Sequence, residues 1–139
     1  MSRSRADVDV LTEKVIGCAI EVHRTLGPGL LEGVYLECLI VELTAAQLCV
    51  QSEGRIPLEY KGQPIRGKLR LDLLIEGCVV VELKAVDVLH PIHLAQVITY
   101  LKLTGCPAGL LMNFNTTSLR AGLRRLDHPD WHVKTNPIP

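Results

Sequence analysis

Residues 70–85, RLDLLIEGCVVVELKA, form an almost wholly apolar stretch that nevertheless contains Asp72, Glu82 and Lys84. Apolar runs on both sides of a Glu-Gly pair predict two antiparallel strands joined by a hairpin turn at 76–77. Charged side chains are rarely buried in such a core unless they are paired or bind a ligand. These three charges are therefore the first candidates for a functional site.

The register of this hairpin decides whether the charges meet. Side chains alternate along a strand, so Glu82 and Lys84 point to the same face. A strict two-residue turn at 76–77 would pair Asp72 with Val81 and direct the two carboxylates to opposite faces. An odd-length loop or a one-residue bulge would instead pair Asp72 near Glu82. We predict the odd register.

Periodicity predicts the other elements of an α/β fold. A helical period of apolar residues alternates with shorter strand-like runs, and the Gly-Pro-Gly segment at 27–29 separates the first two helices. Asp7 or Asp9 is the expected N-cap of the first helix. We expect helices near 11–26, 31–48, 90–104 and 117–126, strands near 55–60, 65–75, 78–86 and 108–114, and a loose C-terminal tail from residue 128.

The length of 139 residues suits one domain with a sizeable core. We expect a single domain over 1–139, with its core at about 10–126. The apolar fraction of 47% and the absence of low-complexity tracts argue against disorder. The sequence shows no internal repeat and no linker that would divide the chain.

Charge and cysteine content exclude several classes of protein. Fifteen basic and fifteen acidic residues cancel, so no global field attracts nucleic acid or an anionic membrane. No apolar run is long enough to span a bilayer. The five cysteines lack CxxC spacing, which disfavours a zinc site or a disulfide framework and favours reduced thiols. We therefore expect a soluble, cytoplasmic protein without a membrane partner.

Converging carboxylates have a specific chemical consequence. Two like charges a few ångströms apart need a cation to be tolerated, and oxygen ligands alone favour Mg²⁺ or Mn²⁺. Lys84 beside them would orient a water molecule or neutralise a phosphate, as in metal-assisted phosphodiester hydrolysis. The D-x9-E-x-K spacing is short and permissive, so a structural network of Asp72, Glu82 and Lys84 at a sheet edge stays open as the alternative.

Several separated motifs resemble one family in the same order. These are GLLEGVY at 29–35, VEL at 41–43, and then RLDLL, VVVELKAV, HLAQVITYLKLTG and GLLMNFN. Together they resemble the GxxExxY family of the PD-(D/E)XK nuclease superfamily over about residues 10–126. The resemblance implies a restriction-endonuclease-like core, a mixed and mainly three-to-four-stranded sheet flanked by helices. It also implies that Asp72, Glu82 and Lys84 are the acid, acid and lysine of a metal-dependent nuclease.

The predicted third helix carries a second motif. Gln96 and Tyr100 are spaced i, i+4 on one face, with His93 one turn before them. They resemble the Q-x3-Y element that lies alongside the active site in the exonuclease-like branch of the superfamily. The alternatives are that Tyr100 is a half-buried core aromatic and that His93 packs or caps the helix.

Glu32 and Tyr35 share a face of the predicted second helix. A carboxylate in the first helical turn is explained by the helix dipole alone. The resemblance raises a second interpretation, in which Glu32 faces the metal as a third carboxylate and Tyr35 is hydrogen-bonded nearby. His23 and Arg24 suit the C-terminal dipole of the first helix, and Arg24 is also a candidate phosphate contact.

Two groups of basic residues are candidates for contact with a phosphate backbone. Arg66, Lys68 and Arg70 share one strand face, and Arg120, Arg124 and Arg125 are expected to cluster on one helical side. Solvated surface is the alternative explanation for each. Aromatic residues make up only 4% of the chain, which disfavours a stacking platform for single strands.

The resulting prediction is a Mg²⁺- or Mn²⁺-dependent nuclease that acts on DNA. Asp72, Glu82 and Glu32 would hold the metal, Lys84 would act on water or phosphate, and Gln96 and Tyr100 would shape the site. The alternative is a catalytically inactive nuclease fold that binds nucleic acid or a protein partner. The small size and high apolar content predict a homodimer.

Overall fold

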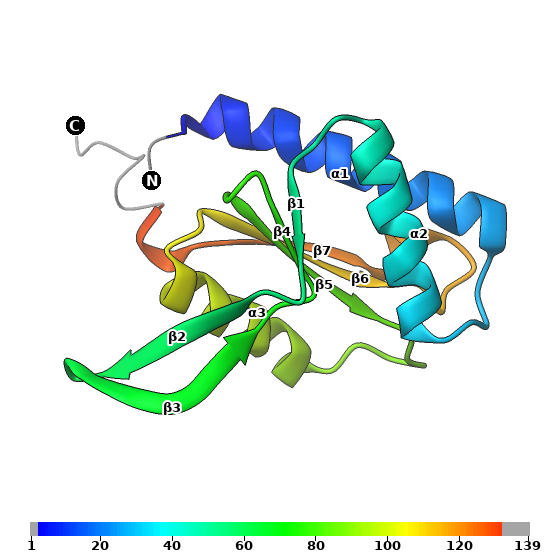
Figure 1. Cartoon of the computed structure of the whole chain (residues 1–139). Coiled ribbons are helices and arrows are strands. Elements are labelled where there is room, and N and C mark those ends of the chain that lie inside the picture. The colour runs from blue at the N-terminus through cyan, green and yellow to red at the C-terminus, as the bar shows by residue number, and fades with distance from the viewer. Residues whose placement is uncertain (1–2, 132–139) are drawn as a thin grey trace, which may run out of the picture.

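The structure is a computed structural model and describes residues 3–131 (Figure 1). In chain order, its elements are α1 (Arg5–Leu26), α2 (Glu32–Ala45), β1 (Val50–Ser52), β2 (Arg55–Tyr60), β3 (Gln63–Arg70), β4 (Leu73–Ile75), β5 (Val79–Lys84), α3 (Pro91–Thr104), β6 (Ala108–Asn113), the 3₁₀ helix η1 (Leu119–Gly122) and β7 (Leu123–Asp127). The predicted α/β class is confirmed.

The strands form two separate sheets. Five of them lie in the order β1-β4-β5-β6-β7, and β2 pairs only with β3 as a two-stranded hairpin (Figure 1). Within the larger sheet β5 and β6 are parallel, and the other neighbours are antiparallel. The mixed sheet was predicted, but with three to four strands where the structure has five.

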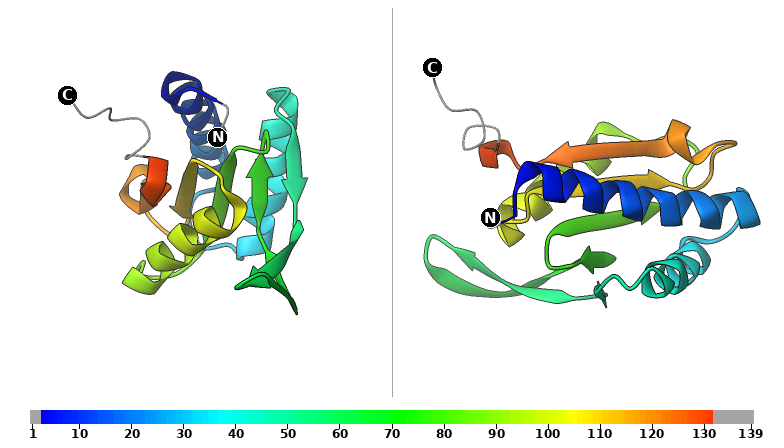
Figure 2. Two further views of the ribbon diagram at one scale, coloured as in Figure 1. Left: turned by 90° about the vertical axis from the view of Figure 1, so that its left-hand side faces the viewer. Right: turned by 90° about the horizontal axis from the view of Figure 1, so that it is seen from above.

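Helices cover both faces of the larger sheet (Figure 2). Helices α1 and α2 pack on the face that carries Val79, Val81 and Leu83. Helix α3 packs on the opposite face, where Leu101 contacts the cluster of buried residues that includes Val80. The alternation expected for this strand is therefore confirmed, and it places Glu82 on the α3 face.

The β4–β5 hairpin has the predicted odd register. Ile75 pairs with Val79 and Leu73 pairs with Val81, so the loop contains three residues, 76–78. Glu76 and Gly77 both adopt positive φ angles, 55° and 60°, which close the turn. Because Cys78 is the extra residue, Asp72 comes to lie opposite Glu82 and not opposite Val81.

Some predicted elements differ from the observed ones. The strand expected over 65–75 is two strands in different sheets, because residues 71–72 leave β3 and pair with the backbone of Glu53 and Gly54. The short β1 was not predicted. The N-cap of α1 is Ser4, whose Oγ accepts a hydrogen bond from the backbone N of Asp7, and not Asp7 or Asp9.

The C-terminal region differs most from expectation. The helix predicted over 117–126 is wrong: η1 ends at Gly122, and β7 then supplies backbone partners for the edge of β6. The predicted loose tail is wrong for residues 128–131, since Trp131 is buried and Arg5 lies 4.6 Å above its ring centroid. The rest of that tail lies outside the described residues. No helix within 3–131 has the length and apolar character needed to cross a membrane.

Close packing of α3 on the sheet gives a stability prediction at Gly109. A Cβ atom there would lie 2.7 Å from Cγ1 of the buried Val97. Since Val is stiff at χ1, Gly109→Ala is expected to lower the free energy of unfolding by about 1–3 kcal/mol. Gly17→Ala in α1 is the control, because nothing lies within 4 Å of its added Cβ. Its expected effect in urea unfolding is a gain of about 0.5–1 kcal/mol, and equal effects would contradict the prediction.

Candidate active site

Two hydrogen bonds from backbone N atoms hold the carboxylates of Asp72 and Glu82 side by side. The backbone N of Asp72 donates to Oε1 of Glu82 (3.1 Å), and the backbone N of Leu83 donates to Oδ2 of Asp72 (2.9 Å). Asp72 occupies the break between β3 and β4, and Glu82 lies within β5. The Asp72 carboxylate is therefore fixed by the backbone of β5, and the Glu82 carboxylate by the backbone at the break between β3 and β4. The two meet on the α3 face.

The electrostatic environment of Glu82 is unfavourable for a charge. Glu82 is only 5% exposed to solvent. Burial, followed by the negative charge of Asp72, raises the pKa of Glu82 from 4.5 to about 8. Lys84 opposes the shift but does not cancel it. The paired carboxyls thus retain a proton at neutral pH unless another cation joins them.

Lys84 and Glu32 lie beside this pair. Lys84 ends β5, and Glu32 begins α2. Partial burial raises the pKa of Glu32, the charge of Lys84 lowers it, and the charge of Asp72 raises it. Glu32 is therefore within electrostatic range of both residues, as expected for a carboxylate that faces the site.

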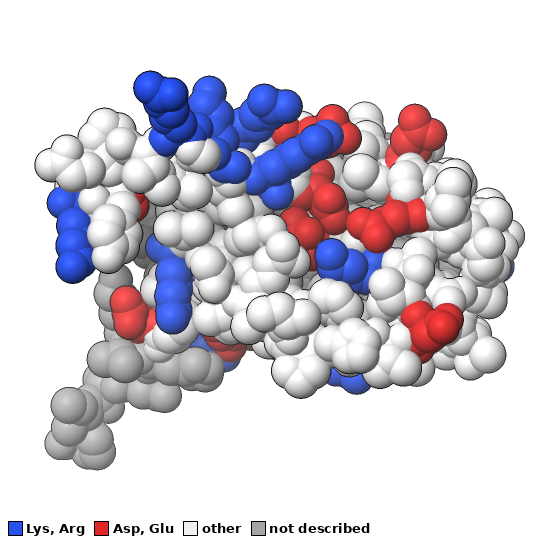
Figure 3. All heavy atoms as spheres, turned by 90° about the horizontal axis from the view of Figure 1, so that it is seen from below, with Lys and Arg blue, Asp and Glu red and all other residues white. Residues whose placement is uncertain are grey.

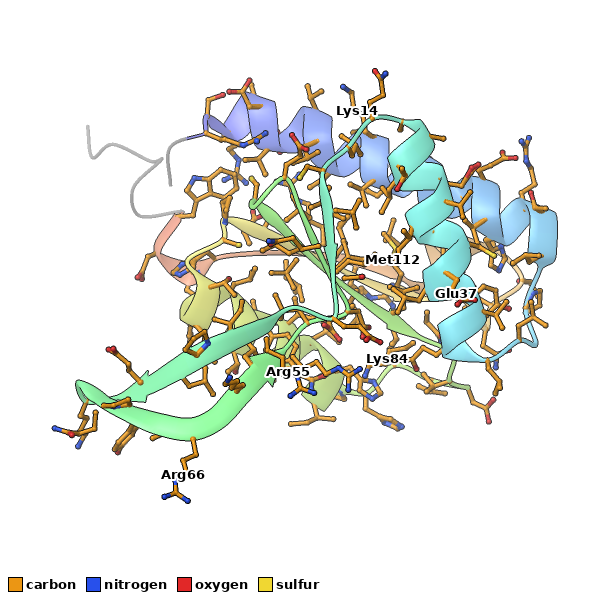
Figure 4. All side chains as sticks on the ribbon, viewed as in Figure 1. Lys14, Glu37, Arg55, Arg66, Lys84 and Met112 are labelled. Carbon is orange, nitrogen blue, oxygen red and sulfur yellow. The ribbon has the colours of Figure 1, made fainter. Side chains whose placement is uncertain are left out.

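Helix α3 forms one wall of a groove next to the pair. His93, Gln96 and Tyr100 line this groove together with Lys84, whose place at the end of β5 is labelled in Figure 4. Burial, then the charges of Glu82 and Asp72, raise the pKa of Tyr100, and Gln96 beside it opposes the shift. The predicted common face of α3 is confirmed. His93 also caps the helix, because its Nδ1 accepts a hydrogen bond from the backbone N of His90.

The donors at the site suit a hard divalent cation. Asp72 and Glu82 contribute only oxygen atoms, and their mutual repulsion is what a cation relieves. Within residues 3–131, no group of three or more His, Cys, Asp and Glu side chains is arranged to hold a metal ion. Glu32 thus lies near the pair without completing a three-residue ligand set, and its metal-binding role stays a prediction.

Comparison with known proteins identifies the family. A family model described as the PD-(D/E)XK nuclease superfamily matches residues 9–126. The chain belongs to this superfamily. Neither the curated proteins nor the solved structures contain a match. The mixed sheet flanked by helices is consistent with a restriction-endonuclease-like fold, and membership of the GxxExxY family stays a prediction.

Asn113 is a residue of this nuclease fold whose role the sequence analysis missed. It is buried at the end of β6, directly beside Lys84 in the parallel register. Its Oδ1 accepts a hydrogen bond from the backbone N of Val86, and its Nδ2 donates to the carbonyl of Val86. Asn113 therefore fixes the chain just after Lys84. The signal was an amide at the end of an otherwise apolar run.

Tyr35 was expected to be hydrogen-bonded near Glu32, and its partners are backbone atoms of the loop before α2. It is fully buried and stacks on Phe114, with 4.6 Å between ring centroids. Its hydroxyl donates to the carbonyl of Gly27 (2.6 Å) and accepts from the backbone N of Leu30 (3.1 Å). Tyr35 thus fixes the loop before α2 and positions Glu32 indirectly.

The two predicted basic groups have different outcomes. Arg66, Lys68 and Arg70 do share one side of β3, where they line a common groove. The cluster predicted at 120–125 is wrong, because Arg124 and Arg125 are consecutive residues of a strand, not of a helix, and point to opposite faces. Arg125 instead pairs with Asp9 and Asp127.

The residues at the end of α1 have structural partners. His23 is buried and its Nε2 lies 2.8 Å from the carbonyl oxygen of Thr116. Arg24 forms an ion pair with Glu21 on the same helix. Neither contact brings His23 or Arg24 to the carboxylate pair.

The raised pKa of Glu82 predicts how stability depends on pH without metal. The native state holds a proton that the unfolded chain releases, so this stabilisation is complete below about pH 4.5 and is lost as pH rises through about 8. Relative to acidic pH, the free energy of unfolding at pH 7 is lower by on the order of 3 kcal/mol. Glu82→Gln should remove this loss, and urea unfolding in EDTA at acidic and basic pH measures it.

Glu13→Gln on the exposed side of α1 is the control for that substitution. It should retain the wild-type decline in stability with rising pH. The prediction is contradicted if Glu82→Gln shows the same decline as the wild type.

Proposed function

We propose that this chain is a nuclease that uses Mg²⁺ or Mn²⁺ to hydrolyse phosphodiester bonds, with DNA as its substrate. The observation that supports this proposal most is the pair of backbone hydrogen bonds that holds the carboxylates of Asp72 and Glu82 side by side. Membership of the superfamily supports the same reaction class. A homodimer and a cytoplasmic location stay predictions from the sequence.

Each residue has a proposed role in that reaction. Asp72 and Glu82 would hold the ion, which would supply an activated water and stabilise charge on the phosphoryl oxygens. Lys84, at the end of β5, orients the attacking water or neutralises the phosphate. Glu32 assists in metal binding, and Gln96 and Tyr100 shape the groove that receives the substrate.

Metal binding is the first prediction of this proposal. Mg²⁺ or Mn²⁺ should raise the melting temperature of the wild type, since a ligand at 100 times its dissociation constant stabilises a protein by about 2.7 kcal/mol. Asp72→Asn should abolish the rise because it removes one of the two ligands. Thermal unfolding with and without metal measures this effect, and Glu13→Gln should respond like the wild type. An equal rise in Asp72→Asn would assign the carboxylates a structural role.

Cleavage is the second prediction, and it depends on Lys84. Labelled single- and double-stranded DNA and RNA, linear and circular, are incubated with protein and Mg²⁺ or Mn²⁺. Lys84→Ala is expected to reduce the rate by at least about a hundredfold, the usual cost of losing a group that stabilises transition-state charge. Lys102→Ala on the exposed part of α3 is the matched control and should cleave normally. Cleavage that survives in Lys84→Ala would remove this lysine from the mechanism.

A further inference from the structure

The β2–β3 hairpin concentrates positive charge beside the site. Residues 55–70 contain five of the chain's fifteen basic residues and a single acid, Glu59. The rest of the chain compensates this excess, because the net charge is zero. Lys and Arg side chains gather on one part of the surface, next to a group of acidic ones (Figure 3). The electrostatic field that the whole chain lacks is thus present locally.

Only one face of the β2–β3 hairpin packs against the rest of the protein. Leu69 is buried, and Ile56 and Leu58 pack in the same cluster as Leu101 of α3. The opposite face carries Arg55, Arg66, Lys68 and Arg70, which are exposed and line an open groove of about 340 Å³. The hairpin is therefore anchored by its apolar side and presents its basic side to solvent.

The basic face works against the stability of the hairpin. Arg55 lies directly opposite Arg70 in the register of β2 and β3, and like charges in such cross-strand pairs are destabilising. Arg70 has an ion pair with Glu53 at 3.1 Å, but both side chains are 59% exposed, and such pairs contribute little. Arg55, Arg66 and Lys68 have no ion pair with any residue in 3–131. An anionic ligand is what would compensate this face.

The basic residues also lead directly to the carboxylates. Arg66, Lys68 and Arg70 line one groove on the exposed side of β3. Asp72 follows Arg70 by two residues, just beyond the end of β3. Arginine matches phosphate geometry with two parallel hydrogen bonds. A phosphate backbone bound at Arg66, Lys68 and Arg70 would therefore lie close in the chain to Asp72.

We propose that the β2–β3 hairpin is a substrate-binding arm whose basic face binds the phosphate backbone of the nucleic-acid strand and leads it to Asp72 and Glu82. This inference rests on the proposed nuclease function and adds where the strand lies. The contact is to phosphates, which single strands and duplexes share. A two-stranded ribbon also has the right size for the major groove of a duplex.

Binding measured without catalysis tests the arm. Fluorescent duplex and single-stranded DNA of one sequence are titrated with protein in EDTA, at several salt concentrations between about 50 and 200 mM. The variants are Arg66→Ala, Lys68→Ala and their combination. Lys14→Ala is the control, because this exposed lysine lies on α1, on the opposite side of the molecule from Arg66 (Figure 4).

Each arm substitution should weaken binding and reduce the slope of log K against log salt. The expected reduction is about 0.9 per residue if the strand is in a duplex and about 0.7 if it is single. The reduction and the more tightly bound probe together identify which form the arm binds. Arg66→Lys keeps the charge and should keep the slope, and Lys14→Ala should bind as the wild type does.

Two results would overturn the proposal that the hairpin is a substrate-binding arm. One is a salt slope in the arm variants equal to that of Lys14→Ala, and the other is a wild type that binds neither probe. Cleavage assays separate this failure from failure of the nuclease proposal. Cleavage that does not depend on Arg66 or Lys68 would contradict the proposed arm but not the proposed nuclease activity. Binding that depends on the arm, with no cleavage of any substrate, would support the arm and reject the nuclease.

Discussion

The candidate site depends on one extra residue in the β4–β5 loop. With Cys78 in the loop, Ile75 pairs with Val79, and the alternation of both strands brings Asp72 and Glu82 to one face. A loop one residue shorter would move every side chain of one strand to the other face of the sheet. The positive φ angle of Glu76 is the local cost of this turn, whereas glycine at position 77 adopts its positive φ without a steric penalty. The apolar residues of the hairpin hold the resulting register against both layers of helices.

The parallel pairing of β5 and β6 completes the site. Because α3 connects these two strands, it packs across the sheet face that carries Glu82 and brings Gln96 and Tyr100 to the same groove as Lys84. Gly109 permits this close approach, since a side chain there would overlap Val97. Asn113 then ties the chain after Lys84 to the end of β6. Three separate segments thus converge at the carboxyl end of β5, where open α/β sheets commonly bind ligands.

Local sequence patterns predicted those parts of the fold that depend on a single helix or hairpin. The helical period located α1, α2 and α3, and strand parity reduced the register of the hairpin to two choices. Prediction failed where the secondary structure depends on backbone contacts between residues far apart in the sequence. The break at residues 71–72 depends on hydrogen bonds to Glu53 and Gly54, and β7 forms by pairing with β6 across the sheet. Leu119 and Leu123 are spaced as in a helix, so periodicity alone was misleading there.

For the candidate site, the sequence could not predict the direction in which each side chain points. Sequence spacing placed Glu32 and Tyr35 on one face of α2, yet the ring of Tyr35 is buried against Phe114 while Glu32 interacts with Lys84 and Asp72. A helical face of more than 100° can hold both positions, and only tertiary packing separates them. Asn113 was missed for the same reason, because its importance comes from the backbone of Val86 across the sheet.

The geometry differs from that of a stabilising ion-pair network. A stabilising network would pair Lys84 directly with a carboxylate and lower the pKa of its acids. In residues 3–131, Lys84 has no ion pair, and Glu82 instead has its pKa raised to about 8 by burial and by Asp72. The arrangement therefore costs folding free energy, which a structural network would not do. A buried and a half-buried carboxylate that face each other near a lysine without an ion pair form an arrangement that the proposed binding of a cation and a phosphate would explain.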